Sequence, residues 1–226
     1  MSLRAKYSRG RQGMPLRPRF PSVRALTGAA LLFAGMIAAP LTPARAADCP
    51  DAEALHAAGV TLTRNSPKMA QAYRYENGTL TSYRVDDPEL GRPPKRERYD
   101  HPLAVSLQEM DGRSFALIYD DDPARLGQLP QLGNWRTPVS LKVDGETKDR
   151  GTISYAYRGT GSVQIGACRY DVWQVVERIA MGKLRTAFLK EFSPKAGLVL
   201  RVTKLDPETG KAQSQVAFDR IETRQK

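Results

Sequence analysis

The sequence predicts an all-β protein: a curved antiparallel meander, shaped as a half-barrel or open barrel, with one short N-terminal helix. Two patterns predict this fold. From residue 60 onward, apolar and polar residues alternate with the period of two that a half-buried strand requires. Turn signals such as Asn77-Gly78 and Asp111-Gly112 separate these runs, and both dipeptides favour hairpins. Strands joined by such short links are expected to pair with their sequence neighbours.

The first 46 residues have the three parts of a secretory signal. A basic stretch is followed by an apolar run over residues 25–41 and by the small-residue site Ala44-Arg45-Ala46. The alternative is a retained membrane anchor, but Pro40 and Pro43 interrupt a run shorter than the ~20 apolar residues of a stable span. We therefore expect residues 1–46 to be a cleavable signal peptide and residues 47–226 to form a single antiparallel β domain, with no stable membrane span after cleavage. The sequence leaves open whether translation starts at Met1 or Met14.

The strongly basic character of the chain comes mainly from this leader. The whole sequence has a net charge of +11, but residues 1–46 hold eight of its 35 basic residues and none of its 24 acidic ones. The remaining chain has 27 basic and 24 acidic residues, a net charge of +3. A nucleic-acid partner is therefore not expected, because such binding requires a basic domain.

Two cysteines, Cys49 and Cys168, remain after the predicted cleavage. Export brings them into an oxidising compartment, where two thiols usually pair. A disulfide between them would close a loop of about 120 residues and stabilise the fold by roughly 4–5 kcal/mol. The alternative is a redox pair, but the sequence has no Cys-x-x-Cys motif. We predict a structural disulfide.

In the N-terminal half, residues 48–59 read as one short helix, with acidic residues near its start and Gly59 at its end. Residues 86–102 are rich in proline and charge, and we interpret them as an exposed connector. The alternative is that Lys95, Arg96 and Arg98 contact an anionic head group. The apolar loop over residues 123–135 either plugs one end of the sheet or lines a pocket, and we favour the plug.

In the C-terminal half, residues 144–151 and 159–161 read as turns. Residues 161–204 are expected to form three consecutive antiparallel strands at the middle of the sheet. Both alternating positions of residues 169–179 are apolar, as in a strand that is covered on both faces. Residues 206–210 should close a last hairpin, whose returning segment ends the sheet.

The sequence lacks the common catalytic motifs. It has no Gly-x-Ser-x-Gly elbow, His-Glu-x-x-His motif, Walker loop or dinucleotide fingerprint. Two histidines in unfavourable contexts leave little for acid–base catalysis. We expect no enzyme, no cofactor and no metal site. The alternative is a carboxylate-based envelope hydrolase, which would need two buried carboxylates with raised pKa values facing each other in a cleft.

One part of the chain resembles a known class of proteins. The segment GACRYDVW at residues 166–173, the turn SPKAG at 193–197 and the strand start LVLR at 198–201 resemble exported bacterial β-sheet proteins of unknown function. Those proteins are similar in turn to periplasmic lipoprotein-carrier half-barrels, in which a curved sheet wraps an apolar cavity under a helical lid. The resemblance covers roughly residues 150–205 and implies a fold more than a function. This chain has one predicted short helix and no lid helices, and no binding residue is carried over.

These observations predict a periplasmic or secreted, non-catalytic envelope protein. Its partner is an unknown envelope component, either an apolar ligand in the concavity of the sheet or another protein. If it carries an apolar ligand, we expect a dry pocket of several hundred Å³ lined by residues such as Tyr155, Trp173 and Phe188. If its core has no such pocket, a protein-binding module is the better interpretation.

Overall fold

The computed structural model describes residues 49–224. The predicted signal peptide, residues 1–46, lies outside the described residues. Within residues 49–224, no helix combines the length and apolar composition needed to cross a membrane.

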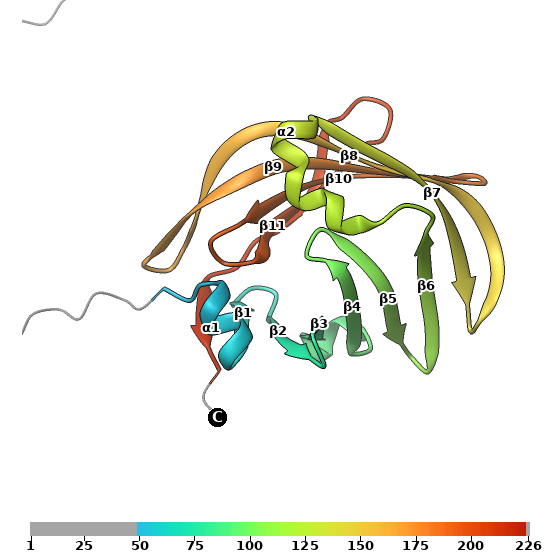
Figure 1. Cartoon of the computed structure of the whole chain (residues 1–226). Helices are drawn as coiled ribbons and strands as arrows, with labels where there is room; N and C mark the ends of the chain where they lie inside the picture. Colours follow the sequence, from blue (N-terminus) through green and yellow to red (C-terminus); the bar gives the residue numbers. More distant parts are fainter. Residues whose placement is uncertain (1–48, 225–226) are drawn as a thin grey trace, which may run out of the picture. The chain divides into compact units, whose positions relative to one another are not determined.

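The described residues form one antiparallel sheet of thirteen strands, which confirms the predicted all-β meander (Figure 1). The sheet is not closed: its order runs from β12 through β11, β10 and so on to β1, and then to β13. The predicted N-terminal helix is α1 (Ala52–Ala57), capped by the Asp51 carboxylate. The strands are β1 (Val60–Arg64), β2 (Met69–Glu76), β3 (Thr79–Asp86), β4 (Lys95–His101), β5 (Ala104–Met110), β6 (Arg113–Tyr119), β7 (Asn134–Val143), β8 (Glu146–Ile165), β9 (Cys168–Met181), β10 (Leu184–Ser193), β11 (Leu198–Leu205), β12 (Ala212–Val216) and β13 (Arg220–Thr223).

The sheet curves strongly, and its last strand breaks the expected neighbour pairing. β13 pairs with β1 at the edge of the sheet opposite to β12, although only residues 217–219 join β12 to β13. Four extended Cα steps span at most about 14 Å, so the two edges approach each other at this point. On another part of the sheet, Lys190 Nζ of β10 donates to Leu103 O between β4 and β5, at 2.8 Å. The curvature thus brings together strands that are distant in the sheet order.

The two hairpin turns predicted from dipeptides are confirmed. Asn77-Gly78 connects β2 to β3, and Asp111-Gly112 connects β5 to β6. Asn77 has φ 50° and Gly78 has φ 77°. This left-handed region is the one that Asn and Gly tolerate and that a two-residue hairpin requires.

Three local predictions were wrong. Residues 95–101 are not part of an exposed connector but form β4, which follows the short 3-10 helix η1 (Pro88–Leu90). In this strand Glu97 and Tyr99 are buried while Arg96 and Arg98 are exposed. Buried and exposed positions therefore alternate, but charged residues occupy positions of both kinds. The predicted turn at 144–151 is only Asp144-Gly145, and residues 159–161 continue β8. Gly159 lies where the β8–β9 register shifts, because a glycine with φ 121° accommodates a bulge as readily as a turn.

The central stretch forms β9, β10 and β11 as expected, but these strands are fourth, third and second from the β12 edge and not at the middle. β9 is covered on different faces along its length. Cys168, Tyr170 and Val172 contribute to one core, which we call the first core, and the oppositely directed Trp173 and Val175 contribute to the second core. The strand therefore changes its buried face between Val172 and Trp173.

The N-terminal segment is fastened to the first core. Cys49 and Cys168 form the predicted disulfide, with their Cα atoms 5.5 Å apart. Tyr170 Oη donates to Pro50 O at 2.9 Å, and Ala52 N donates to Lys195 O at 2.8 Å. These contacts hold α1 beside β2 so that Leu55 is buried (Figure 1).

The apolar loop after β6 plugs the second core, as favoured from the sequence. It forms the 3-10 helix η2 (Pro123–Gln128) and the short helix α2 (Leu129–Leu132), an element that was not predicted. Leu126 and Leu129 are fully buried in the second core. α2 lies against β7 and β8 (Figure 1).

Candidate functional site

The structure places the three predicted pocket residues on one inner face of the sheet but in unequal environments. Tyr155, Glu177 and Phe188 face one another across β8, β9 and β10. Tyr155 is fully buried and Phe188 is half-buried. Trp173 is half-buried and meets Phe192 edge-on, with ring centroids 5.4 Å apart. A cavity lined by Tyr155, Trp173 and Phe188 remains a prediction.

Beside Tyr155 lies a buried ion pair that sequence analysis missed. Lys190 Nζ contacts Glu177 Oε2, and both side chains are largely buried. The Lys190 ammonium also lies 5.7 Å from the centre of the Tyr155 ring. Burial, and secondarily the charge of Lys190, lowers the pKa of the nearby His101 to about 4. The available sequence signals were a lysine that alternates with Phe188 and Phe192 on β10 and a glutamate that follows an apolar stretch of β9.

Two polar atoms near this pair lack partners among the described residues. Tyr155 Oη and Trp135 Nε1 are buried without a hydrogen bond to residues 49–224. Their rings are 5.9 Å apart in the second core. Burial, followed by the charge of Glu177, raises the pKa of Tyr155 well above its ordinary value. Tyr155 therefore remains a neutral phenol at physiological pH.

A second polar network lies on the inner face of β2, β3 and β4. Glu97 accepts hydrogen bonds from Tyr99 Oη at 2.6 Å and from Ser82 Oγ at 3.3 Å, and pairs with Lys95 Nζ at 2.6 Å. Burial alone raises the pKa of Glu97, but Lys95 and the Tyr99 hydroxyl outweigh it, so the pKa is lowered overall. Glu97 is therefore a stable carboxylate.

The buried carboxylates give no observation in favour of the hydrolase alternative. A general acid of that chemistry needs a carboxyl whose pKa is raised, whereas the pKa of Glu97 is lowered. Among residues 49–224, no three His, Cys, Asp or Glu side chains come together as a metal site requires. Each buried carboxylate has a basic partner: Asp86 with Arg84, Glu97 with Lys95, Glu177 with Lys190 and Glu191 with Arg201.

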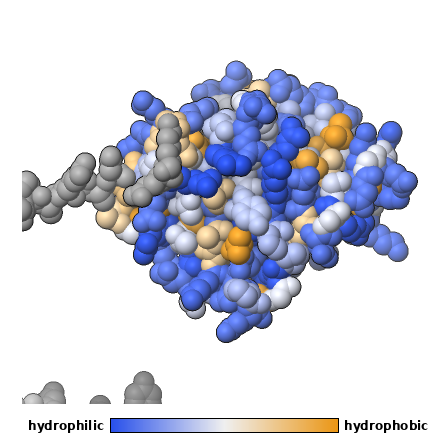
Figure 2. Space-filling model, turned by 90° about the horizontal axis from the view of Figure 1, so that it is seen from below, coloured by the Kyte–Doolittle hydropathy of each residue, from blue (hydrophilic) through white to orange (hydrophobic). Residues whose placement is uncertain are grey.

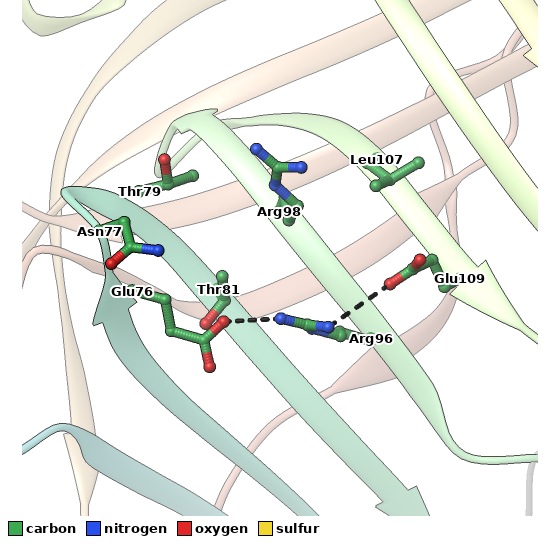
Figure 3. Close-up of a pocket in the computed structure, with 8 residues that line it drawn as sticks. All are labelled: Glu76, Asn77, Thr79, Thr81, Arg96, Arg98, Leu107 and Glu109. Carbon is green, nitrogen blue, oxygen red and sulfur yellow. Dashed lines mark hydrogen bonds and ion pairs between the residues drawn. The ribbon is translucent and has the colours of Figure 1, made fainter.

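The outer face of the same strands carries a polar hollow of about 400 Å³ (Figure 3). Arg96 lies between Glu76, at 2.6 Å, and Glu109, at 3.9 Å, so its charge is balanced. No carboxylate of the described chain lies within 4.0 Å of the Arg98 guanidinium. The hollow is lined by Glu76, Asn77, Thr79, Thr81, Arg96, Arg98, Leu107 and Glu109.

Arg98 is consequently an available cation at the edge of this hollow. In Figure 3 its guanidinium lies between Thr79 and Leu107, away from the ion pairs of Arg96. The sequence alternative for Lys95, Arg96 and Arg98 was contact with an anionic head group. The structure separates these residues: Lys95 pairs inward with Glu97, Arg96 pairs with Glu76, and Arg98 remains unpaired within residues 49–224.

An exposed apolar patch adjoins the hollow. On β3, Tyr83 is 51% exposed and Val85 is 42% exposed, and Leu90 is exposed in the following η1. Tyr83 pairs directly with Arg96 across the β3–β4 ladder, which places the patch beside the hollow. Ala72 and Ala70 of β2 pair with Tyr83 and Val85, so the neighbouring surface carries only small, uncharged side chains there. Figure 2 views the molecule from below Figure 1 and shows hydrophobic residues gathered in small patches among hydrophilic ones.

A second hollow, of about 560 Å³, lies along the outer part of the β8–β9 hairpin. It is polar and is lined by Thr160, Gly161, Ser162, Arg169 and Asp171. These residues include part of the segment that the sequence suggested as a turn.

Comparisons with known proteins add little. No family model matches the chain, and no curated protein matches it. Among solved structures, the crystal structure of the hypothetical lipoprotein YmcC from Escherichia coli is similar at a TM-score of 0.41 and 10% identity. That similarity covers 74% of this chain and 84% of YmcC. A similarity this weak supports no conclusion about the present chain.

Proposed function

We propose that this protein is an exported, non-catalytic component of the bacterial envelope that binds another envelope protein through the outer face of β2, β3 and β4. It works in the periplasm or outside the cell. The leader over residues 1–46 and the disulfide between Cys49 and Cys168 support export, because such bonds persist in oxidising compartments.

The observation that carries the proposal is the pairing of an available arginine with an exposed apolar patch. Arg98 has no carboxylate partner among the described residues and pairs with Thr81 of β3. The exposed Tyr83 lies one row along the same face, and the exposed Val85 lies one row further. Exposed apolar residues next to an arginine are typical of protein-binding surfaces, where aromatic and arginine side chains contribute most of the affinity. The complementary partner presents an apolar side chain next to a carboxylate.

An apolar ligand is the less favoured occupant. It would require a dry cavity lined by Tyr155, Trp173 and Phe188, whereas both hollows described above are polar and contain none of these residues. We therefore favour the partner protein over the carrier interpretation.

In-cell photo-cross-linking tests the proposal. A benzophenone amino acid is placed at Tyr83 and, in a separate strain, at Leu132, which is exposed in α2 far along the chain. We expect one discrete protein adduct from position 83 and none from position 132. Adding Arg98→Glu should abolish the adduct, while Lys211→Glu, an exposed control, should leave it unchanged.

Two results would refute the proposal. One is the absence of any adduct from position 83 in cells that produce the folded protein. The other is an adduct that survives Arg98→Glu, because the arginine would then not contribute to recognition.

A further inference from the structure

Four arginines on neighbouring strands share one face of the sheet: Arg136 of β7, Arg150 of β8, Arg178 of β9 and Arg185 of β10. We call this set the basic face. Arg136 and Arg178 both lie in register with Ser154 of β8. In the next row, Ala180 of β9 pairs with Arg185. Directly paired residues of a sheet point to the same side, so the four side chains project from one surface.

That surface is the solvent side of the strands. The residues that alternate with the arginines, including Trp135, Thr137, Ile153 and Tyr155, are buried. Because successive side chains of a strand point to opposite faces, the arginines project outward, and all four are exposed.

The charges of the basic face are not balanced within the described chain. No carboxylate of residues 49–224 lies within 4.0 Å of these four guanidiniums. Neutral oxygens hold three of them: Arg136 Nη2 donates to Thr152 Oγ1 at 3.3 Å, Arg178 Nη1 to Pro207 O at 2.8 Å, and Arg185 Nη1 to Gly182 O at 2.8 Å. These acceptors orient the side chains and leave their positive charge available.

Three other exposed arginines of the sheet differ in this respect, whereas Arg98, Arg158 and Arg169 also have no carboxylate within 4.0 Å among residues 49–224. Arg74 pairs with Glu76, Arg113 with Asp144, and Arg220 with Glu222. The local cancellation of charge that is found on those strands is therefore missing on the basic face.

We propose that the basic face docks the protein onto the surface of an anionic phospholipid membrane. The arginines are spread over four strands, with about 4.8 Å between neighbouring strands. A surface with many anionic head groups can contact all of them, whereas a single small anion cannot. The outward residues between them are small or polar (Pro138, Ser140, Thr152, Ser154 and Ala180). An interface with an acidic protein would need an apolar or aromatic centre that is open to a partner, whereas the apolar cluster on this face (Val176, Ala187 and Leu205) is already buried within the chain.

One exposed aliphatic residue lies at the rim of the basic face. Ile118 of β6 is 46% exposed and pairs with Ser140 of β7, which in turn pairs with Arg150. At a membrane surface this side chain reaches the boundary of the head groups and adds apolar burial to the electrostatic attraction.

Vesicle sedimentation of the exported protein tests the inference. Mass spectrometry first establishes the N-terminus of the mature protein that is used. The protein is mixed with phosphatidylcholine vesicles, with or without phosphatidylglycerol. We expect partition onto the anionic vesicles only, and a fall in partition as salt screens the charges. The variant Arg136→Gln/Arg150→Gln/Arg178→Gln should bind about a hundredfold more weakly, because each basic side chain near such a surface contributes about fivefold.

A matched control separates this face from the net charge of the protein. Lys68→Gln/Arg169→Gln/Lys195→Gln removes the same charge from exposed positions elsewhere and should retain binding within about threefold. Circular dichroism and urea unfolding establish that both variants are folded. Equal losses in both variants, equal binding to neutral vesicles, or binding to soluble polyglutamate without binding to vesicles would each overturn the inference.

Discussion

Lys190 and Glu177 form the ion pair whose disruption should matter most for stability. The Lys190 side chain is only 12% exposed, whereas that of Lys148, which pairs with Glu146, is 53% exposed. Removing one partner of a buried pair leaves an uncompensated charge, so Lys190→Met should lower the free energy of unfolding by about 3–5 kcal/mol. Lys148→Met should change it by less than about 1 kcal/mol. Urea titration monitored by tryptophan fluorescence measures both.

The double variant Lys190→Met/Glu177→Gln distinguishes the buried charge from lost packing. It should regain a large part of the loss caused by Lys190→Met, because no charge then remains buried. A double variant as unstable as Lys190→Met would show that packing, and not charge, sets the cost.

His101 should make stability depend on pH. Its pKa is about 4 in the folded protein, chiefly because it is buried and secondarily because Lys190 is near, against about 6.5 when unfolded. As the pH falls below about 6.5 the unfolded chain binds a proton first, so this contribution is complete above 6.5 and is lost progressively toward pH 4. The loss amounts to about 3 kcal/mol.

A substitution at His101 isolates this contribution. His101 Nδ1 accepts a hydrogen bond from Leu103 N at 3.2 Å, and an asparagine side chain can accept from the same position two residues on. His101→Asn should therefore flatten the stability profile between pH 4 and 6.5 in chemical denaturation. An unchanged profile would show that other groups, such as Glu97, dominate acid destabilisation.

At the scale of single residues, the sequence predicted features that depend on neighbouring residues of the chain. It did not predict contacts that depend on the register between strands. Asn77-Gly78 was readable because the turn requires a backbone conformation that these residues favour. The Lys190–Glu177 pair was not readable, because it depends on how β9 and β10 align and on the curvature that carries Leu103 to Lys190.

At the scale of elements, strand existence was predictable wherever apolar residues mark the buried face. β4 was missed because Lys95 and Glu97 occupy two of its inward positions and neutralise each other there. Gly159 was interpreted as a turn because a glycine favours turns and bulges alike, and only the pairing of β8 with β9 decides between them.

Gly151 tests the packing of β8 against β9. A Cβ at this position would lie 2.0 Å from Ala180 O and 2.4 Å from Met181 Cγ, so the strands would have to separate. Gly151→Ala should destabilise the fold by about 2 kcal/mol or more, within the usual range for overpacking. Gly127→Ala in η2 is the control, because its nearest neighbour, His101 Nε2, lies at 4.0 Å. Equal thermal midpoints for the two variants would contradict this packing.

At the scale of the whole molecule, the disulfide joins the N-terminal segment to the sheet across 119 residues. Cys49→Ala/Cys168→Ala should lower the free energy of unfolding by about 4–5 kcal/mol, because the unfolded chain regains the freedom of a long loop. The N-terminal segment should stay attached to the sheet, since Pro50 and Ala52 also hydrogen-bond to Tyr170 and Lys195. Adding a reductant should reproduce the loss in the parent protein and should leave the variant unaffected.

The topology was predictable except at its end. Most sequential strands from β1 to β12 are joined by short links that favour their pairing, the exceptions being residues 87–94 and 120–133. Residues 217–219, by contrast, can reach either β12 or the opposite edge of a curved sheet. When β13 pairs with β1, Phe218 and Ile221 are buried in the first core. A sequence cannot reveal this choice, because it depends on the curvature of all thirteen strands.

The central claim is that the protein binds its partners on its outer surface and holds no ligand within the sheet. Native mass spectrometry of protein purified from its own compartment, washed at roughly 1 M salt to release surface-bound lipid, tests this claim most directly. We predict the mass of the bare polypeptide, lighter by two hydrogens because of the Cys49–Cys168 bond. A lipid or other apolar molecule retained at one copy per chain would contradict the account.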